Sequence, residues 1–177
     1  MPRLFTAIEL PADIRLRLSM IRADVQHAHW IEVDNMHVTL RFAGDITDGQ
    51  ADDFARALDD VRAAPFTFRI AGAGAFGGQH PTVLYAAIEA NEALDALQRQ
   101  HERAARLAGL GPEPKPFKPH VTLARLRQGR ASRVARFLEQ NGDLRLGPIA
   151  VERFVLLSAR REVGGGPYAL EEAYDLG

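Results

Sequence analysis

The chain contains no cysteine, which excludes disulfide bonds, a thiolate nucleophile and cysteine-ligated metal sites. It also lacks an excess of charge of either sign, because 22 basic residues are balanced by 23 acidic ones. This balance argues against a protein that coats nucleic acid with a strongly basic surface. Lysine is scarce: only Lys115 and Lys118 occur, and the other 20 basic residues (22 − 2) are arginines. Genomic base composition is the simpler explanation of that bias, although the planar guanidinium also suits phosphate recognition.

Long apolar runs are missing as well. No stretch approaches the length of a membrane span. The N-terminus does not resemble a signal peptide, because Asp13 and Arg15 interrupt its apolar residues early. We therefore expect a cytoplasmic protein with no membrane partner. With 177 residues, 46% of them hydrophobic, the chain is long enough to bury a core.

One tetrapeptide, His-Val-Thr-Leu, occurs twice, at residues 37–40 and 120–123. In a β-strand alternate side chains share a face, so His37 would point the same way as Thr39, and His120 the same way as Thr122. Two such strands facing each other would offer two imidazoles and two hydroxyls to one cleft. This is the equipment for acid–base chemistry on a phosphodiester, in which one imidazole removes a proton and the other supplies one.

The segments around the two copies carry a family resemblance. They are residues 30–36 (WIEVDNM) and 41–44 (RFAG) around the first copy, and 116–119 (PFKP) and 124–126 (ARL) around the second. With them the chain resembles the 2H phosphoesterase superfamily, and within it the RNA 2′,3′-cyclic phosphodiesterases, once described as 2′-5′ RNA ligases. That family has a pair of His-hydrophobic-Thr/Ser-hydrophobic motifs. Segments 3–11 (RLFTAIELP) and 154–158 (FVLLS) are also similar to it, so the resemblance covers almost the whole chain.

Periodicity and turn signals predict strands alternating with helices. The predicted helices are 12–27, 48–64, 91–107 and 132–140. The predicted strands are 3–10, 30–33, 35–42, 66–70, 82–88, 119–126, 149–158 and 168–174. A glycine-rich loop is expected over 72–78, and a loop rich in proline and glycine over 109–116.

This order predicts an α+β fold with two lobes that echo one another. Each lobe is expected to be a mainly antiparallel sheet backed by helices, with a pseudo-twofold cleft between the lobes. The resemblance implies the same arrangement. No low-complexity linker separates the halves, so we expect residues 1–177 to form a single bilobal domain, and we expect a monomer.

We expect His37 and His120 to be the catalytic pair, since imidazole changes protonation near neutral pH. Thr39 and Thr122 are expected to donate hydrogen bonds to phosphate oxygens, although threonine is also simply a good strand residue. The resemblance favours Arg125 as a phosphate ligand. By strict alternation Arg125 would face away from His120, so it needs a strand end or a bulge to reach the phosphate.

Three aromatic residues and several polar ones are further candidates for the site. Phe117, in a proline-flanked loop before the second motif, is the better candidate for stacking on a base, while Phe5 suits core packing and Tyr168 stays open. Arg41 has the parity of His37, but a peripheral role is equally compatible. The glycine-rich stretch lacks the dinucleotide-binding spacing. His27 and His29 form an H-x-H pair without a nearby third ligand, so we expect no metal and no cofactor.

The predicted function is therefore metal-independent hydrolysis of 2′,3′-cyclic phosphate ends of RNA or nucleotides by two histidines. The resemblance implies a 2′-phosphomonoester product. His120 is taken as the base and His37 as the acid. The alternatives are a 2H enzyme acting on 2′-5′ linked oligonucleotides or on ADP-ribose cyclic phosphate, and a non-catalytic RNA-binding module.

Overall fold

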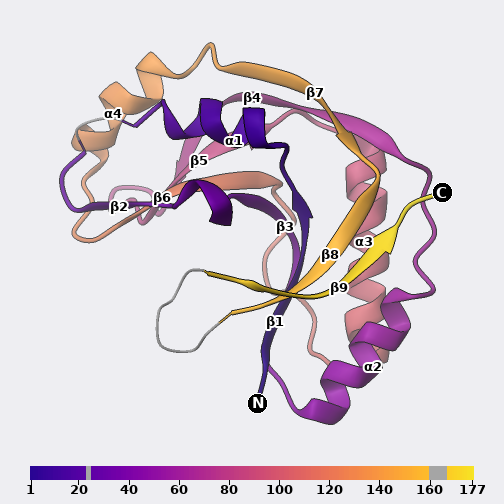
Figure 1. The fold of residues 1–177 in the computed structure, drawn as a ribbon. Coiled ribbons are helices and arrows are strands. Elements are labelled where there is room, and N and C mark those ends of the chain that lie inside the picture. Colours follow the sequence, from indigo (N-terminus) through magenta and orange to yellow (C-terminus); the bar gives the residue numbers. More distant parts are fainter. Residues whose placement is uncertain (23–24, 160–166) are drawn as a thin grey trace.

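The structure is a computed structural model that describes residues 1–22, 25–159 and 167–177 (Figure 1). Its elements are β1 (Arg3–Glu9), α1 (Ala12–Ser19), β2 (Ala28–Trp30), the 3₁₀ turn η1 (Val33–Asn35), β3 (His37–Asp45), α2 (Asp48–Leu58), β4 (Phe66–Phe76), β5 (Val83–Ile88), α3 (Glu92–Leu107), β6 (His120–Leu126), α4 (Ala131–Gln140), β7 (Arg145–Val151), β8 (Arg153–Ser158) and β9 (Ala169–Asp175). The predicted α+β class is confirmed.

Within the described residues, nine strands form one antiparallel sheet in the order β7-β4-β5-β6-β3-β1-β8-β9, with β2 paired to β6. The two motif strands, β3 and β6, are neighbours at its centre (Figure 1). β5, β4 and β7 follow on the outer side of β6, and β1, β8 and β9 follow on the outer side of β3. Apart from β2, the sheet therefore has two halves of four strands each. The halves meet through one residue pair, Val38 with Val121. This arrangement agrees with the expected two-lobed fold.

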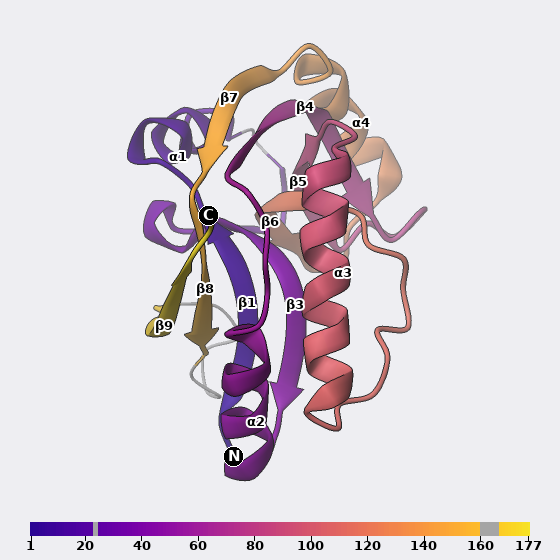
Figure 2. The same ribbon diagram turned by 90° about the vertical axis from the view of Figure 1, so that its right-hand side faces the viewer.

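The helices pack against this sheet, and the main hydrophobic core lies between the helices and the strands. α3 contacts β3 and α2, and α4 contacts β4. Figure 2 shows α2 and α3 side by side. Each begins at a capped residue, Thr47 in a capping box with Gln50 for α2 and Asn91 for α3. The buried cluster between helices and sheet includes Leu94 and Leu97 of α3.

Two helices are shorter than predicted. The helix expected over 12–27 ends at Ser19, where the N–H groups of Met20 and Ile21 bond three residues back instead of four. His27 has a φ of 62°, which a right-handed helix does not contain. Residues 23–24 of that prediction lie outside the described part. The helix expected to reach residue 64 ends at Leu58, again in a series of tighter turns.

The short strand expected over 30–33 lies instead at Ala28–Trp30, and Val33–Asn35 forms the 3₁₀ turn. The glycine-rich loop was also wrong in part, because β4 continues through Gly72 and Gly74 to Phe76. A Cβ on Gly74 would lie 2.4 Å from the ring of Tyr85 on the next strand. Glycine here therefore marks a close approach within a sheet, which composition alone does not distinguish from a loop.

The single strand expected over 149–158 is two strands that break at Glu152. β7 pairs with β4 in one half of the sheet, and β8 pairs with β1 in the other. The sequence marks this break, because the charged pair Glu152 and Arg153 interrupts the alternation and a continuous apolar run, 154–157, follows it. The other predicted elements begin and end within three residues of their observed bounds.

Candidate active site

The two copies of His-Val-Thr-Leu lie on adjacent antiparallel strands, and their register decides where the side chains point. Val38 of β3 is paired with Val121 of β6, and both valines are completely buried. Paired residues of an antiparallel ladder point to the same face, and their neighbours point to the other face. The histidine before each valine and the threonine after it therefore share the face opposite the core. The two motifs thus bring two imidazoles and two hydroxyls to one surface.

Each motif strand contains a β-bulge just after its threonine. In β3, Ala7 is opposite Thr39 and Thr6 is opposite Arg41, so Leu40 has no partner on β1. A bulge reverses the alternation beyond it. Phe42 is accordingly exposed, whereas Arg41 is buried.

The bulge in β6 is equivalent. Tyr85 is opposite Thr122 and Leu84 is opposite Ala124, which leaves Leu123 as the extra residue. Ala124 is buried and Arg125 is exposed. The geometric condition set for Arg125 by the sequence, a bulge that turns it toward the histidine face, is therefore met.

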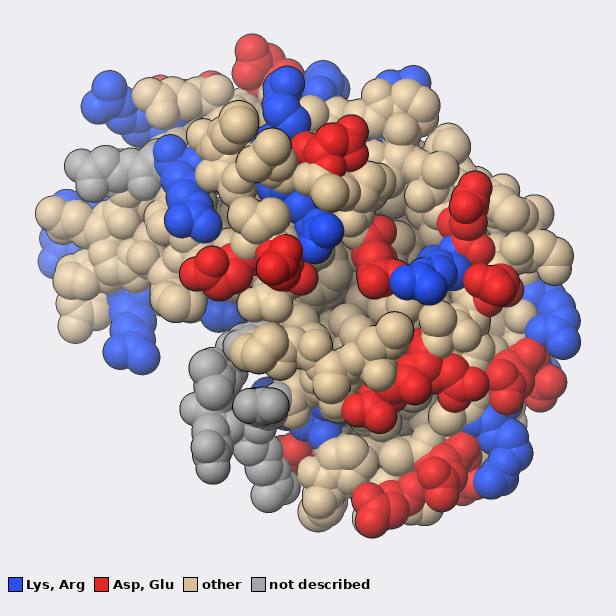
Figure 3. All heavy atoms as spheres, viewed as in Figure 1, with Lys and Arg blue, Asp and Glu red and all other residues tan. Residues whose placement is uncertain are grey.

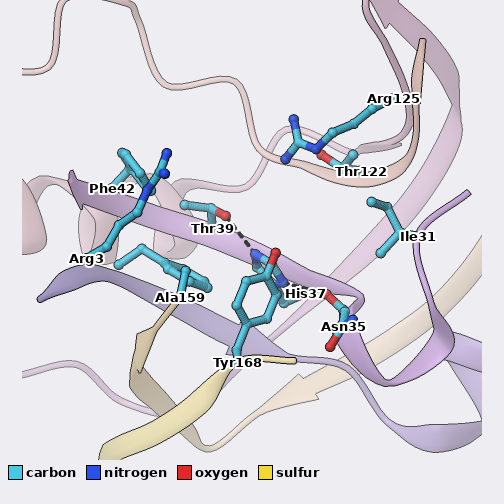
Figure 4. A pocket seen from close by; sticks show the side chains of 11 residues that line it. Arg3, Ile31, Asn35, His37, Thr39, Phe42, Thr122, Arg125, Ala159 and Tyr168 are labelled. Carbon is cyan, nitrogen blue, oxygen red and sulfur yellow. Dashed lines mark hydrogen bonds between the residues drawn. The ribbon is translucent and has the colours of Figure 1, made fainter. Parts of the chain in front are cut away.

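A pocket of about 260 Å³ opens on this face. Its lining combines cations, hydroxyls and aromatic rings from both halves of the sheet, as Figure 4 shows. The lining residues are Arg3, Phe5, Ile31, Asn35, His37, Thr39, Phe42, Thr122, Arg125, Ala159 and Tyr168. Its size suits a phosphate group with part of a nucleoside rather than a long chain.

Both imidazoles are held in the same way. Nδ1 of His37 lies 2.7 Å from the carbonyl oxygen of Asn35, and Nδ1 of His120 lies 2.8 Å from that of Lys118. A carbonyl oxygen only accepts, so Nδ1–H is the donor in each ring and the lone pair of the neutral ring is on Nε2. Nε2 of His37 is 3.0 Å from the hydroxyl of Thr39, which Figure 4 marks with a dashed line.

Aromatic rings flank both histidines. The ring of His37 lies 5.0 Å from that of Phe5 and 5.3 Å from that of Tyr168. The ring of His120 lies 4.9 Å from that of Phe76 and 5.4 Å from that of Tyr85. These contacts fix the ring planes, so that each Nε2 is oriented before a substrate arrives.

The surroundings lower the pKa of both imidazoles. Burial is the main cause for His37, and the charges of His120 and Arg125 lower its pKa further against the hydrogen bond to Asn35. Burial also lowers the pKa of His120, assisted by the charges of Arg125 and Lys118. The charge of Arg125 lowers the pKa of both imidazoles. Tyr168 stays a neutral hydrogen-bond donor, since burial raises the pKa of its hydroxyl.

The structure brings four of the six residues expected in the site into the pocket lining: His37, Thr39, Thr122 and Arg125. His120 shares their face of the sheet but lies beside the pocket, against Phe76 and Tyr85.

Phe117 is not among the residues that line the pocket. It is partly buried against the main core cluster, so its role in stacking stays a prediction. Of the other aromatic candidates, Phe5 is 4% exposed and serves both the core and the pocket, and Tyr168 lines the pocket. Arg41 lies on the other side of β3, where its Nε is 2.6 Å from Glu102.

Sequence reasoning missed Arg3 and Phe42. The guanidinium of Arg3 lies 5.4 Å from the centre of the Phe42 ring, and both line the pocket. Phe42 holds the place in the first motif that Arg125 holds in the second. The repeat could therefore have identified Phe42, because it is five residues after His37, as Arg125 is five residues after His120.

Among residues 1–22, 25–159 and 167–177, no group of three or more His, Asp or Glu is arranged to hold a metal ion. His29 pairs with Arg125 across β2 and β6, so it flanks the site as an exposed strand residue. No helix in the described part of the chain is long and apolar enough to cross a membrane.

The chain is similar to known proteins over most of its length. The profile of the family described as LigT like Phosphoesterase matches residues 8–85 and 87–168. A Thermus thermophilus protein named RNA 2′,3′-cyclic phosphodiesterase is 32% identical over 190 residues, which cover 98% of this chain and 90% of that protein. A Geobacillus stearothermophilus protein of the same name is 31% identical over 72% of this chain, but the match spans only 43% of that protein.

The fold itself is also found in solved structures. The crystal structure of E. coli LigT complexed with 3′-AMP superposes with a TM-score of 0.78 at 24% identity and covers 99% of both chains. At this identity the likeness concerns the fold, and it extends over both halves of the sheet.

Proposed function

Because the chain belongs to the LigT like phosphoesterase family, part of the 2H phosphoesterase superfamily, we propose that it hydrolyses 2′,3′-cyclic phosphate ends of RNA or nucleotides to 2′-phosphomonoesters. The observation that carries this proposal is the pairing of the motif strands at Val38 and Val121, which turns both histidines toward one face. The relatives named RNA 2′,3′-cyclic phosphodiesterase support the substrate class.

The reaction needs two proton transfers. A base takes a proton from water while the water oxygen bonds to phosphorus, and the bond from phosphorus to the 3′ oxygen breaks. An acid gives its proton to that leaving oxygen, so the 2′ ester remains. Two imidazoles in opposite protonation states supply both steps, and neither step calls for a metal.

We assign His120 as the base and His37 as the acid. In the described part of the chain no group hydrogen-bonds Nε2 of His120, so its lone pair is open to a water molecule. Nε2 of His37 is already engaged by Thr39, which holds that ring in place for proton donation. After one turnover His120 carries the extra proton and His37 has lost one, and exchange with solvent restores the pair.

Charge that develops on the phosphoryl oxygens needs fixed donors. Arg3, Arg125, Thr39, Thr122 and Tyr168 offer cationic or hydroxyl donors within one pocket. Such preorganised donors stabilise a transition state without reorganisation at the moment of reaction. In this proposal Arg125 has a second role, because its charge lowers the pKa of both histidines and so disfavours a doubly protonated pair.

The direct test is turnover of a 2′,3′-cyclic mononucleotide and of an RNA ending in a cyclic phosphate, with the product isomer identified by ³¹P NMR. The proposal predicts the 2′-monoester, and full activity in excess EDTA. A 3′-monoester product would contradict the assignment of the leaving oxygen. Loss of activity on chelation, restored by one divalent ion, would show that the mechanism depends on a metal.

A further inference from the structure

Basic residues are concentrated in one segment of this otherwise balanced chain. Residues 114–138 contain seven basic side chains (Lys115, Lys118, Arg125, Arg127, Arg130, Arg133 and Arg136) and no acidic one. The remainder holds 15 basic (22 − 7) and 23 acidic residues, a net charge of −8. The overall net charge of −1 therefore combines a strongly basic segment with an acidic remainder. The basic segment includes the second histidine motif.

In the part of the chain that the structure describes, no carboxylate forms an ion pair with the arginines of this segment. Arg127, Arg130, Arg133 and Arg136, which we call the arginine face, are all exposed. Within residues 1–22, 25–159 and 167–177, every observed ion pair involves an arginine outside the arginine face. One acid, Glu139, lies near them on α4 and makes no observed ion pair with them, so four like charges repel one another, which is the arrangement expected where a polyanion supplies the counter-charge.

The arginine face begins at the pocket. Arg125 lines the pocket near the end of β6, Arg127 follows that strand, and Arg130 caps α4, which carries the other two arginines. The ten residues of α4 extend this surface by about 15 Å. Along the chain the cations thus run from the pocket residue Arg125 through the connection after β6 to α4, and Figure 1 shows that α4 lies near the end of β6 that carries Arg125.

Acidic residues gather on the other side of the molecule. Asp48, Asp52 and Asp53 lie on α2, and Glu171, Glu172 and Asp175 lie on β9; all are exposed. Figure 3 shows acidic atoms dominating the side of α2 and β9, with basic atoms more frequent toward α4 and β2. A polyanion that leaves the pocket is therefore repelled on one side and attracted on the other.

The chemistry of the arginine face favours phosphates over a membrane or an apolar partner. The exposed large hydrophobic side chains are Met1, Leu16, Met20, Phe42, Leu107 and Leu170, and none lies within 125–136. The apolar residues of α4, Val134 and Phe137, are buried. The surface offers exposed guanidinium groups without an apolar anchor, which suits a phosphodiester backbone.

We propose that the arginine face binds the strand of RNA on the 5′ side of the cyclic phosphate, so that this site is built for polynucleotide ends. The inference rests on the proposed function and deepens it. Backbone contacts of this kind are independent of base sequence and sensitive to salt. The enzyme should therefore prefer RNA to a mononucleotide, with a preference that rises with length and falls with ionic strength.

The test variant is Arg127→Ala/Arg130→Ala/Arg136→Ala, because no side-chain contact of these three is observed in the described part of the chain. Arg133 is kept, since its Nη1 donates to Gln26. The matched control, Arg56→Ala/Arg99→Ala/Arg103→Ala, removes the same charge from exposed positions on α2 and α3. Each protein is assayed with a 2′,3′-cyclic mononucleotide and with RNA of about ten nucleotides ending in a cyclic phosphate, across a salt series.

We expect the test variant to retain mononucleotide turnover within about twofold while its kcat/KM for RNA falls about tenfold at low salt. The slope of log kcat/KM against log salt should shrink by about 2, or ~0.7 for each lost phosphate contact. The control variant should keep the wild-type slope. Equal losses in both variants, or an unchanged slope in the test variant, would overturn the inference while leaving the proposed function standing.

A binding measurement distinguishes failure of the RNA-binding proposal from failure of the proposed hydrolysis. Fluorescence anisotropy with RNA ending in a 3′-phosphate reports on the arginine face even if no cyclic phosphate is turned over. Failure of turnover on every substrate, with RNA binding that depends on the arginine face, would contradict only the proposed function. Binding of polyglutamate to the arginine face with no binding of RNA would show that the face serves an acidic protein and would overturn the inference.

Discussion

Leu40 and Leu123 occupy equivalent places in the two motif strands, because each is the extra residue of a β-bulge three positions after its histidine. Because of the bulges, residues of opposite parity on each strand point to the same face. Before them, valine faces the core, and histidine points to the opposite face, on which the pocket opens. Beyond them the alternation is reversed, so Phe42 and Arg125 join the histidine face although their parity predicts the opposite.

The bulge at Leu40 is held from behind by α3. Gln98 donates to the carbonyl oxygen of Leu40 at 3.4 Å. The hydroxyl of Thr6 lies 2.8 Å from Nδ1 of His101 and accepts from the N–H of Arg41 at 3.1 Å. These buried contacts tie α3 to the backbone of β3 and β1, while Nε2 of His101 has no hydrogen-bond partner among the described residues. α3 therefore contributes to the site through the shape of β3.

This support makes His101 a source of acid sensitivity. The imidazole of His101 is completely buried, and burial lowers its pKa to about 3 from an ordinary value of 6.5. Between these values the unfolded chain binds more protons than the folded one, so stability falls as pH falls below about 6.5. From pH 7 to pH 5 the loss attributable to this group is ~2 kcal/mol, at about 1.4 kcal/mol for each pH unit.

The measurement is the unfolding free energy of the wild type and of His101→Asn by urea denaturation at several pH values. Asparagine keeps a donor and an acceptor near Thr6 but does not titrate. The variant should be less stable at pH 7 and should have a shallower dependence on pH between 7 and 5. Parallel curves for the two proteins would show that His101 does not stay neutral in the folded state.

Arg125 sets the pH range of the histidine pair. The charge of Arg125 lowers the pKa of His37 and of His120, so Arg125→Ala should move both limbs of the bell-shaped kcat/KM profile to higher pH, besides reducing its height. The apparent values belong to the coupled pair. Arg125→Lys keeps a positive charge and should leave the limbs near their wild-type positions.

Lys118 provides the matched control for that shift. Its charge lowers the pKa of His120 and is not among the causes that act on His37. Lys118→Gln should therefore move the profile less than Arg125→Ala does. A profile that stays in place on removal of Arg125 would contradict the electrostatic role given to this residue.

The assignment of acid and base can be tested with a modified leaving group. A 2′,3′-cyclic substrate with sulfur in place of the 3′ oxygen departs as a thiolate, which needs no proton at neutral pH. His37→Ala should recover most of its lost activity on this analogue, whereas His120→Ala should remain impaired. The reverse pattern would exchange the two roles and leave the rest of the mechanism unchanged.

The sequence predicted well which side chains of the two motifs share a face, because the information is local. Two copies of a strand-forming motif with period-2 alternation determine that His37 lies with Thr39 and His120 with Thr122, whatever the rest of the chain does. The same reasoning succeeded for α3, where a capping asparagine and a continuous apolar stripe mark the element.

Features that depend on the neighbouring strand could not be predicted. A bulge is defined by how two strands pair, so the sequence alone does not indicate that Leu40 and Leu123 are the extra residues of bulges. The sequence around Gly74 indicates a loop, and only the close approach of the Tyr85 ring from the neighbouring strand explains why a strand has glycine there. Which half of the sheet accepts each strand on either side of Glu152 depends in the same way on the strands with which it pairs.

The central claim is that His37 and His120 act as one acid–base unit, and a double-mutant cycle on kcat for a 2′,3′-cyclic nucleotide tests it most directly. His37→Ala and His120→Ala should each lower kcat by about 10² to 10⁴, and the double variant should be little slower than the worse single variant. Thermal unfolding of each variant confirms that it is folded. Near-wild-type turnover in both single variants, or losses that simply multiply in the double variant, would contradict the claim.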